Sequence, residues 1–113
     1  MKRRVKKIVT ILNSKKGENI VVFNLEKSDY FVDHVVVVTS MAERHGQSLM
    51  MELKNRLKPE GEEFLHIDES DDWIAIDMGD IIVHIMSQEK RDVFRLEELL
   101  NSINRVKSES VKA

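Results

Sequence analysis

The residues best suited to chemistry lie close together in one short stretch of the chain: Asp77, Asp80 and His84. Two carboxylates beside an imidazole can hold a divalent cation such as Mg²⁺, which supports phosphoryl or nucleotidyl transfer. The sequence contains no Gly-rich phosphate loop, no Gly-Lys-Ser/Thr segment and no nucleophile motif to complete such an enzyme. We therefore expect neither enzymatic activity nor a cofactor. A metal-dependent nucleotidyltransferase that uses Asp77 and Asp80 remains the alternative.

The same stretch predicts a β-hairpin. Two strand candidates flank Met78-Gly79, and Gly at the second position of a two-residue loop is typical of tight hairpins. This loop predicts that Asp77 pairs with Asp80 and that Trp73 pairs with His84. Side chains alternate along a strand and cross-strand partners share a face. One face is therefore expected in the core: Ile74, Ile76, Ile81, Val83 and Ile85. The other face consists of Trp73, Ala75, Asp77, Asp80, Ile82 and His84.

The second face of the hairpin is too polar for a core. A large aromatic side chain beside branched apolar residues, rimmed by acids, is typical of a binding hot spot. Because facing carboxylates repel, we expect a compensating cation, supplied either by Arg91 or by a basic partner. In the alternative interpretation a helix covers this face, Trp73 is ordinary packing and His84 is a buried, hydrogen-bonded imidazole. Spacing alone leaves both interpretations open.

Hydrophobic periodicity predicts the elements that carry the hairpin. An amphipathic helix is expected in the first sixteen residues, a second helix after a capping box formed by Ser40 and Glu43, and a last helix from Ser87. The expected strands are residues 19–25, 33–39, 64–67, 73–77 and 80–86. The order predicts an α/β (α+β) fold with a mixed sheet of about five strands and helices packed on it. Residues 1–104 are expected to form one domain and residues 105–113 a flexible tail.

Composition narrows the possible environments and partners. The 113 residues include no Cys, which excludes disulfides and thiolate metal sites, and no apolar run is long enough to cross a membrane. We expect a cytoplasmic protein. The net charge of −2 hides a separation, because residues 60–80 hold nine acids and no Lys or Arg, whereas residues 1–16 hold seven cations and no acid. The acidic stretch favours a basic protein partner, and the basic first helix could add a minor RNA contact or be a transit peptide.

Three motifs, in order along the chain, resemble the ribosomal silencing factor family, also called Iojap-like. Residues 29–32 are similar to its Asp-Tyr-Phe-Val stretch. Residues 72–84 resemble its signature, in which a Trp strand turns through Asp-x-Gly-Asp into a Val-Val-His strand. Residues 91–100 resemble its closing Arg-x-x-Tyr-x-Leu-Glu-x-Leu-Trp motif. Here Phe94 and Leu100 replace the closing Tyr and Trp, which removes a phenol hydroxyl and an aromatic anchor.

The resemblance implies a fold similar to nucleotidyltransferases but without their catalytic motif. It also implies binding to the large ribosomal subunit through a basic protein at its intersubunit face, ribosomal protein fourteen. Occupying that surface would block joining of the small subunit and repress translation. Some relatives form homodimers. The family's partner-binding positions correspond here to Trp73, Ile74, Asp77, Asp80, Ile82, His84 and Phe94.

Overall fold

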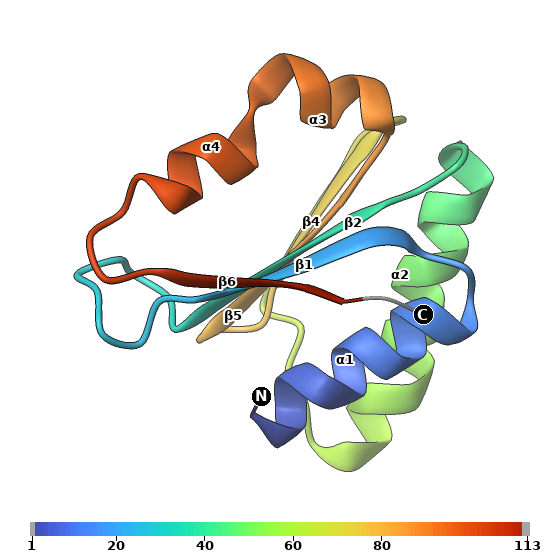
Figure 1. Ribbon diagram of the computed structural model, residues 1–113. Helices are drawn as coiled ribbons and strands as arrows, with labels where there is room; N and C mark the ends of the chain where they lie inside the picture. The colour runs from blue at the N-terminus through green and yellow to red at the C-terminus, as the bar shows by residue number, and fades with distance from the viewer. Residues whose placement is uncertain (1, 112–113) are drawn as a thin grey trace.

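The computed structural model describes residues 2–111 and contains a six-stranded mixed sheet (Figure 1). The helices are α1 (Arg3–Ser14), α2 (Glu43–Leu57), α3 (Gln88–Phe94) and α4 (Leu96–Asn101), with a 3₁₀ turn η1 at Lys58–Glu60. The strands are β1 (Glu18–Asn24), β2 (His34–Thr39), β3 (His66–Glu69), β4 (Trp73–Asp77), β5 (Ile81–Met86) and β6 (Lys107–Val111). Their order is β3-β4-β5-β2-β1-β6, with β2 and β5 parallel and the other neighbours antiparallel. The predicted fold class is confirmed.

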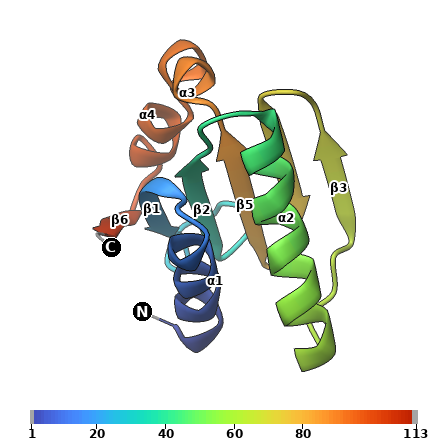
Figure 2. The ribbon, with the colours of Figure 1, turned by 90° about the vertical axis from the view of Figure 1, so that its right-hand side faces the viewer.

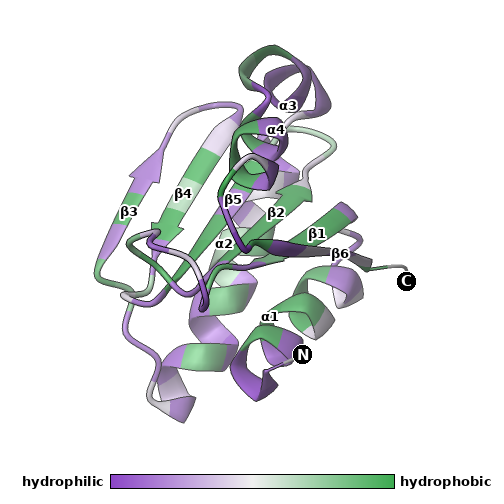
Figure 3. Cartoon of the chain, turned by 60° about the vertical axis from the view of Figure 1, so that its left-hand side comes forward, coloured by the Kyte–Doolittle hydropathy of each residue, from purple (hydrophilic) through white to green (hydrophobic). Residues whose placement is uncertain are grey.

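The sheet separates two hydrophobic cores. Helices α1 and α2 cover one face, and α3 and α4 lie on the other side (Figures 1 and 2). Every residue of β2 is buried, as its run of valines predicts for a central strand covered on both faces. Hydrophobic residues concentrate in the central strands, whereas the edge strand β6 is largely hydrophilic (Figure 3). A polar edge limits pairing with other chains.

Helix α1 forms where the periodicity predicts it. Its apolar stripe, Val5, Ile8, Val9 and Leu12, is buried against the sheet. The chain leaves α1 through Gly17, where a Cβ atom would lie 2.7 Å from Val38 Cγ2 and 2.9 Å from the Leu12 carbonyl oxygen. Any larger residue at this position would therefore push α1 away from the sheet.

The predicted capping box is wrong. Helix α2 begins at Glu43, its N-cap residue is Ala42, and no side chain caps it. Ser40 is only 7% exposed, and its backbone N–H donates to the Met86 carbonyl oxygen, so it extends the pairing of β2 and β5 instead.

The C-terminal segment differs from the expected flexible tail. Residues Lys107–Val111 form β6, which pairs antiparallel with β1 and adds a sixth strand. Two apolar side chains, Ile103 and Val106, pack on the second core and direct the chain back to the sheet edge. Two apolar residues are too few to mark an element in the sequence. Residues 112–113 of the expected tail lie outside the described residues.

The last predicted helix is divided in two. Arg95 has a φ of 49°, in the left-handed region, and it separates α3 from α4. Within residues 2–111, no helix has the length and apolar character needed to cross a membrane.

Candidate functional site

The register of the β4–β5 hairpin differs from the predicted one by two residues. The loop is Gly79-Asp80, closed by a 2.9 Å hydrogen bond from the Met78 N–H to the Ile81 carbonyl oxygen. Gly79 has a φ of 92°, which glycine adopts freely and Met78 would adopt only with strain. The observed register pairs Asp77 with Ile82, and Trp73 with Met86. The predicted pairs are therefore wrong, but the shift is even, so each strand residue keeps its predicted face.

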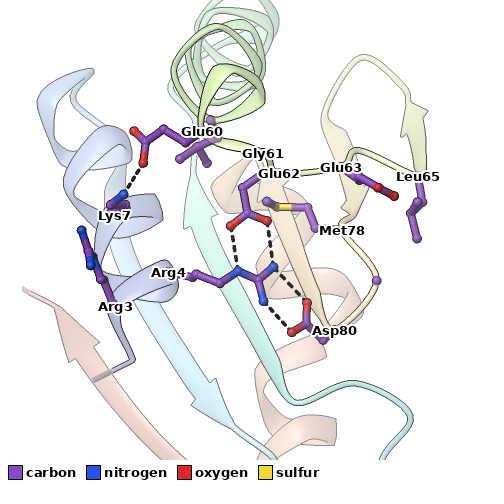
Figure 4. A pocket seen from close by; sticks show the side chains of 12 residues that line it. Arg3, Arg4, Lys7, Glu60, Gly61, Glu62, Glu63, Leu65, Met78 and Asp80 are labelled. Atoms are coloured by element: carbon purple, nitrogen blue, oxygen red, sulfur yellow. Dashed lines mark hydrogen bonds and ion pairs between the residues drawn. The ribbon is translucent and has the colours of Figure 1, made fainter.

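The two carboxylates of the predicted pair have separate partners. Asp77 Oδ1 accepts a 2.8 Å hydrogen bond from the Gly79 N–H inside its own turn. Asp80 accepts from Arg4 Nη1 at 2.6 Å and from Arg4 Nη2 at 3.0 Å, and Arg4 also donates to Glu62 (Figure 4). The expected compensating cation is thus Arg4 of α1, not Arg91. The sequence does contain a signal for this contact, since residues 1–16 are basic and free of acids whereas residues 60–80 are acidic.

The Arg4 contact favours the ionised form of Asp80. The hydrogen bond from the guanidinium lowers the pKa of Asp80, and the Glu62 and Asp80 carboxylates in turn raise the pKa of Arg4. The ion pair therefore persists to a lower pH than an unpaired aspartate would remain ionised. The contact joins α1, the segment after η1 and the β4–β5 turn.

These partners also decide how the residues fit a metal. Asp80 faces Arg4, Asp77 caps its own turn, and His84 Nδ1 accepts a hydrogen bond from Trp73. Over the part of the chain that the structure describes, no three His, Asp or Glu side chains are grouped so that they could share a metal ion. The donors required by the nucleotidyltransferase alternative do not converge.

A half-buried face remains on the side of the hairpin away from α1 and α2. It consists of Trp73, Ala75, Asp77, Ile82 and His84 of the hairpin together with Phe94 of α3 at its border, and we call it the Trp73 face. The Trp73 ring meets the Phe94 ring edge to face, with 5.0 Å between centroids, and Lys90 Nζ lies 4.8 Å from the Phe94 centroid. Phe94 is 53% exposed. Neither interpretation of this face holds in full, because α3 borders the face without covering it.

His84 lies within this face as a neutral imidazole. Its Nδ1 accepts a 3.0 Å hydrogen bond from Trp73 Nε1, which assigns the ring proton to Nε2. Burial lowers the pKa of His84 to about 4. The imidazole therefore orients the indole and carries no charge at neutral pH.

Arg91 holds the helix that presents Phe94. Its buried guanidinium donates from Nη1 to the Asn19 carbonyl oxygen and to Thr39 Oγ1, both at 2.7 Å, and from Nε to Glu97 at 2.8 Å. These bonds connect α3 with β1, β2 and α4. Phe94 follows Arg91 by about one helical turn, so the hydrogen bonds of Arg91 also hold the phenyl ring against Trp73. This role of Arg91 escaped prediction because most of its partners are distant in sequence.

Two of the predicted binding residues lie outside the Trp73 face. Ile74 is on the opposite face, 3% exposed, in the core beneath α1 and α2. Asp80 lies in the turn and points toward Arg4 (Figure 4). The structure brings together the other five, Trp73, Asp77, Ile82, His84 and Phe94.

Comparisons with known proteins agree on one group. The family model described as "Ribosomal silencing factor during starvation" matches residues 1–113. The ribosomal silencing factor of Halalkalibacterium halodurans is 28% identical over 105 residues, which cover 91% of this chain and 90% of that protein. A mouse protein named "Mitochondrial assembly of ribosomal large subunit protein 1" is 24% identical over 97 residues, 81% of this chain and 42% of its own length.

A solved structure shares the fold. The crystal structure of a Chromobacterium violaceum protein superposes with a TM-score of 0.81 at 26% identity, covering 89% of this chain and 88% of that one. The likeness extends over nearly the whole chain.

Proposed function

Because this chain belongs to the ribosomal silencing factor family, we propose that it binds the large ribosomal subunit and sterically blocks joining of the small subunit. In this proposal the contact is with the basic ribosomal protein fourteen at the intersubunit face, and translation is repressed as a result. The protein acts in the cytoplasm as a binding module, with no enzymatic step. A minor contact of α1 with ribosomal RNA and the formation of a homodimer are compatible additions.

The Trp73 face is the observation that carries the proposal. Trp73 and Phe94 form an aromatic pair whose outer ring is largely exposed, beside the apolar side chain of Ile82. Aromatic side chains at the centre of a contact account for much of the binding free energy in protein interfaces. Trp73 is already held by His84, so little conformational entropy is lost when a partner orders it.

Acidic side chains rim this apolar centre. Asp77 lies on the Trp73 face, and Asp71 and Asp72 precede β4 in the loop beside Trp73, where Asp72 also pairs with Lys90 of α3 over 4.0 Å. A basic partner would complement these charges, which accelerates encounter, while the apolar centre slows dissociation. Asp80 contributes less than expected from sequence, because Arg4 already neutralises it.

A matched pair of variants tests the contact. Phe31 is 74% exposed in the loop before β2, at the opposite end of β2 and β5 from Trp73. We expect Phe94→Ala to weaken co-sedimentation with purified large subunits, because it removes part of the aromatic pair, and Phe31→Ala to sediment as the wild type does. Equal sedimentation of all three proteins would reject the Trp73 face as the contact.

A further inference from the structure

A second surface, on the other face of the sheet, has the opposite charge. A groove with a volume of about 380 Å³ lies between α1 and the end of α2. Four cations line it, Arg3, Lys6 and Lys7 from α1 and Arg56 from α2, and Ile11 lies at its base. We call it the α1–α2 groove. Its cations come from two helices that are separate in sequence.

The groove carries an excess of positive charge. Its one lining carboxylate is Glu60, which pairs with Lys7 (Figure 4). The hydrogen bond from Lys7 is the main cause that lowers the pKa of Glu60, and the charges of Arg3 and Arg56 lower it further, so one carboxylate lies in the field of three cations. Among the ion pairs formed within residues 2–111, none includes Arg3, Lys6 or Arg56.

This arrangement opposes the stability of α1. Arg3 lies three residues before Lys6 and four before Lys7, so like charges adjoin on one side of the helix and repel. Arg4 differs, because Glu62 and Asp80 engage it fully. The outward cations contribute nothing comparable to the fold, and an anion with several charges would offset their repulsion.

We propose that the α1–α2 groove binds the phosphate backbone of RNA. The planar forks of Arg3 and Arg56 suit paired phosphate oxygens, and Lys6 adds a mobile point charge. A membrane surface fits less well, because the apolar side of α1 is buried in the core and is not free to enter lipid. The proposal rests on the proposed function only for the source of the RNA, which is the ribosomal particle.

The two surfaces act independently. Helices α1 and α2, which form the groove, lie on one face of the sheet, and α3, which borders the Trp73 face, lies on the other (Figure 2). A partner on one surface therefore leaves the other open. RNA affinity therefore does not depend on Phe94, and binding to a ribosomal protein does not depend on Arg56.

The test measures binding of a fluorescently labelled RNA duplex by the full chain at a series of salt concentrations. The variant is Arg3→Gln, Lys6→Gln and Arg56→Gln together. The matched control, Lys27→Gln, Arg44→Gln and Lys107→Gln together, removes the same charge from three exposed cations outside the groove. Thermal unfolding verifies that both variants are folded, and Phe94→Ala serves as the variant of the other surface.

We expect the groove variant to bind RNA more weakly and its salt slope to fall by roughly three, about one for each phosphate that the variant no longer neutralises. The control and Phe94→Ala should keep the wild-type slope. Equal weakening in the groove variant and the control would overturn the proposal, since it would show that RNA binding depends only on the net charge of the protein. Tight binding to phosphatidylserine vesicles without RNA binding would also overturn it. If Phe94→Ala alone abolishes subunit binding while RNA binding stays intact, the groove is separate from the Trp73 face.

Discussion

Trp73 Nε1 donates a hydrogen bond to Nδ1 of His84 over 3.0 Å, between residues that are diagonal neighbours on the β4–β5 hairpin. The bond fixes the plane of the indole and keeps one imidazole nitrogen free of a proton. Protonation of His84 would turn Nδ1 into a donor and break the bond. Lowering the pH should therefore release the Trp73 indole on the Trp73 face.

The free energy of unfolding should depend on pH through His84. The pKa is about 4 in the folded protein, against 6.5 for an unperturbed imidazole, so the unfolded chain binds more protons between these values. Stability should fall as the pH drops from about 6.5 toward 4, by up to about 3 kcal/mol, and stay level above that window. Urea titrations across this range measure the effect. His84→Gln, which keeps an acceptor but does not titrate, should flatten the curve, and an unchanged curve would assign the pH dependence elsewhere.

Removing the hydrogen bonds of the Arg91 guanidinium should loosen the packing of α3 on the sheet. Arg91→Ala leaves Glu97 without its buried partner and leaves Thr39 and the Asn19 carbonyl oxygen without a donor. The Glu97 side chain is 36% exposed and can be solvated, so the cost comes mainly from the polar groups left without a partner and should be about 1 to 3 kcal/mol. Amide hydrogen exchange should show reduced protection in α3 and α4, and Trp73 fluorescence should shift as Phe94 leaves the indole. The exposed pair Arg95 and Glu98 offers a control, since Arg95→Ala should cost under about 1 kcal/mol. A similar loss of stability in both variants would contradict the role of Arg91 in holding α3.

Two glycines should respond in opposite directions. Gly79→Ala places a Cβ on a residue with a φ of 92° and should destabilise the hairpin by about 1 to 2 kcal/mol. Gly46→Ala in α2 meets Ser40 Oγ at 3.4 Å and Ile74 Cδ1 at 3.6 Å, which are ordinary contacts, so the better helix propensity should stabilise by up to about 1 kcal/mol. Chemical denaturation measures both changes. A neutral Gly79→Ala would contradict the Gly79-Asp80 turn.

Most of the fold could be predicted from local patterns. The valines of β2 and the stripe of α1 report burial directly, because each pattern depends on a single element. The hairpin register could not be predicted in the same way, since Met78-Gly79 and Gly79-Asp80 are both two-residue loops. The preference of the first loop position for a positive φ distinguishes them. Strand β6 could not be predicted, because its residues are mostly polar and form a strand only by pairing with β1.

The sequence predicts most of the residues of the candidate site, but it does not predict the partners of the charged residues. Alternation along β4 and β5 was enough to gather Trp73, Ile82 and His84 on one face. The partners of the charged residues depend on contacts between distant elements, such as Arg4 with Asp80 and Arg91 with Asn19. Ile74 was assigned to the site through the family resemblance, whereas its own alternation placed it in the core, where the structure has it.

The central claim is that this protein blocks subunit joining through the Trp73 face, and a sucrose-gradient assay tests it most directly. Purified large and small subunits would be mixed with wild-type protein, with Trp73→Ala or with the exposed control Phe31→Ala. Loss of a central Trp costs about 2 kcal/mol or more of binding free energy. We predict that wild type and Phe31→Ala leave the subunits separate and that Trp73→Ala, shown to be folded by thermal unfolding, allows joined particles to form. Joined particles at the same level with and without wild-type protein would contradict the account.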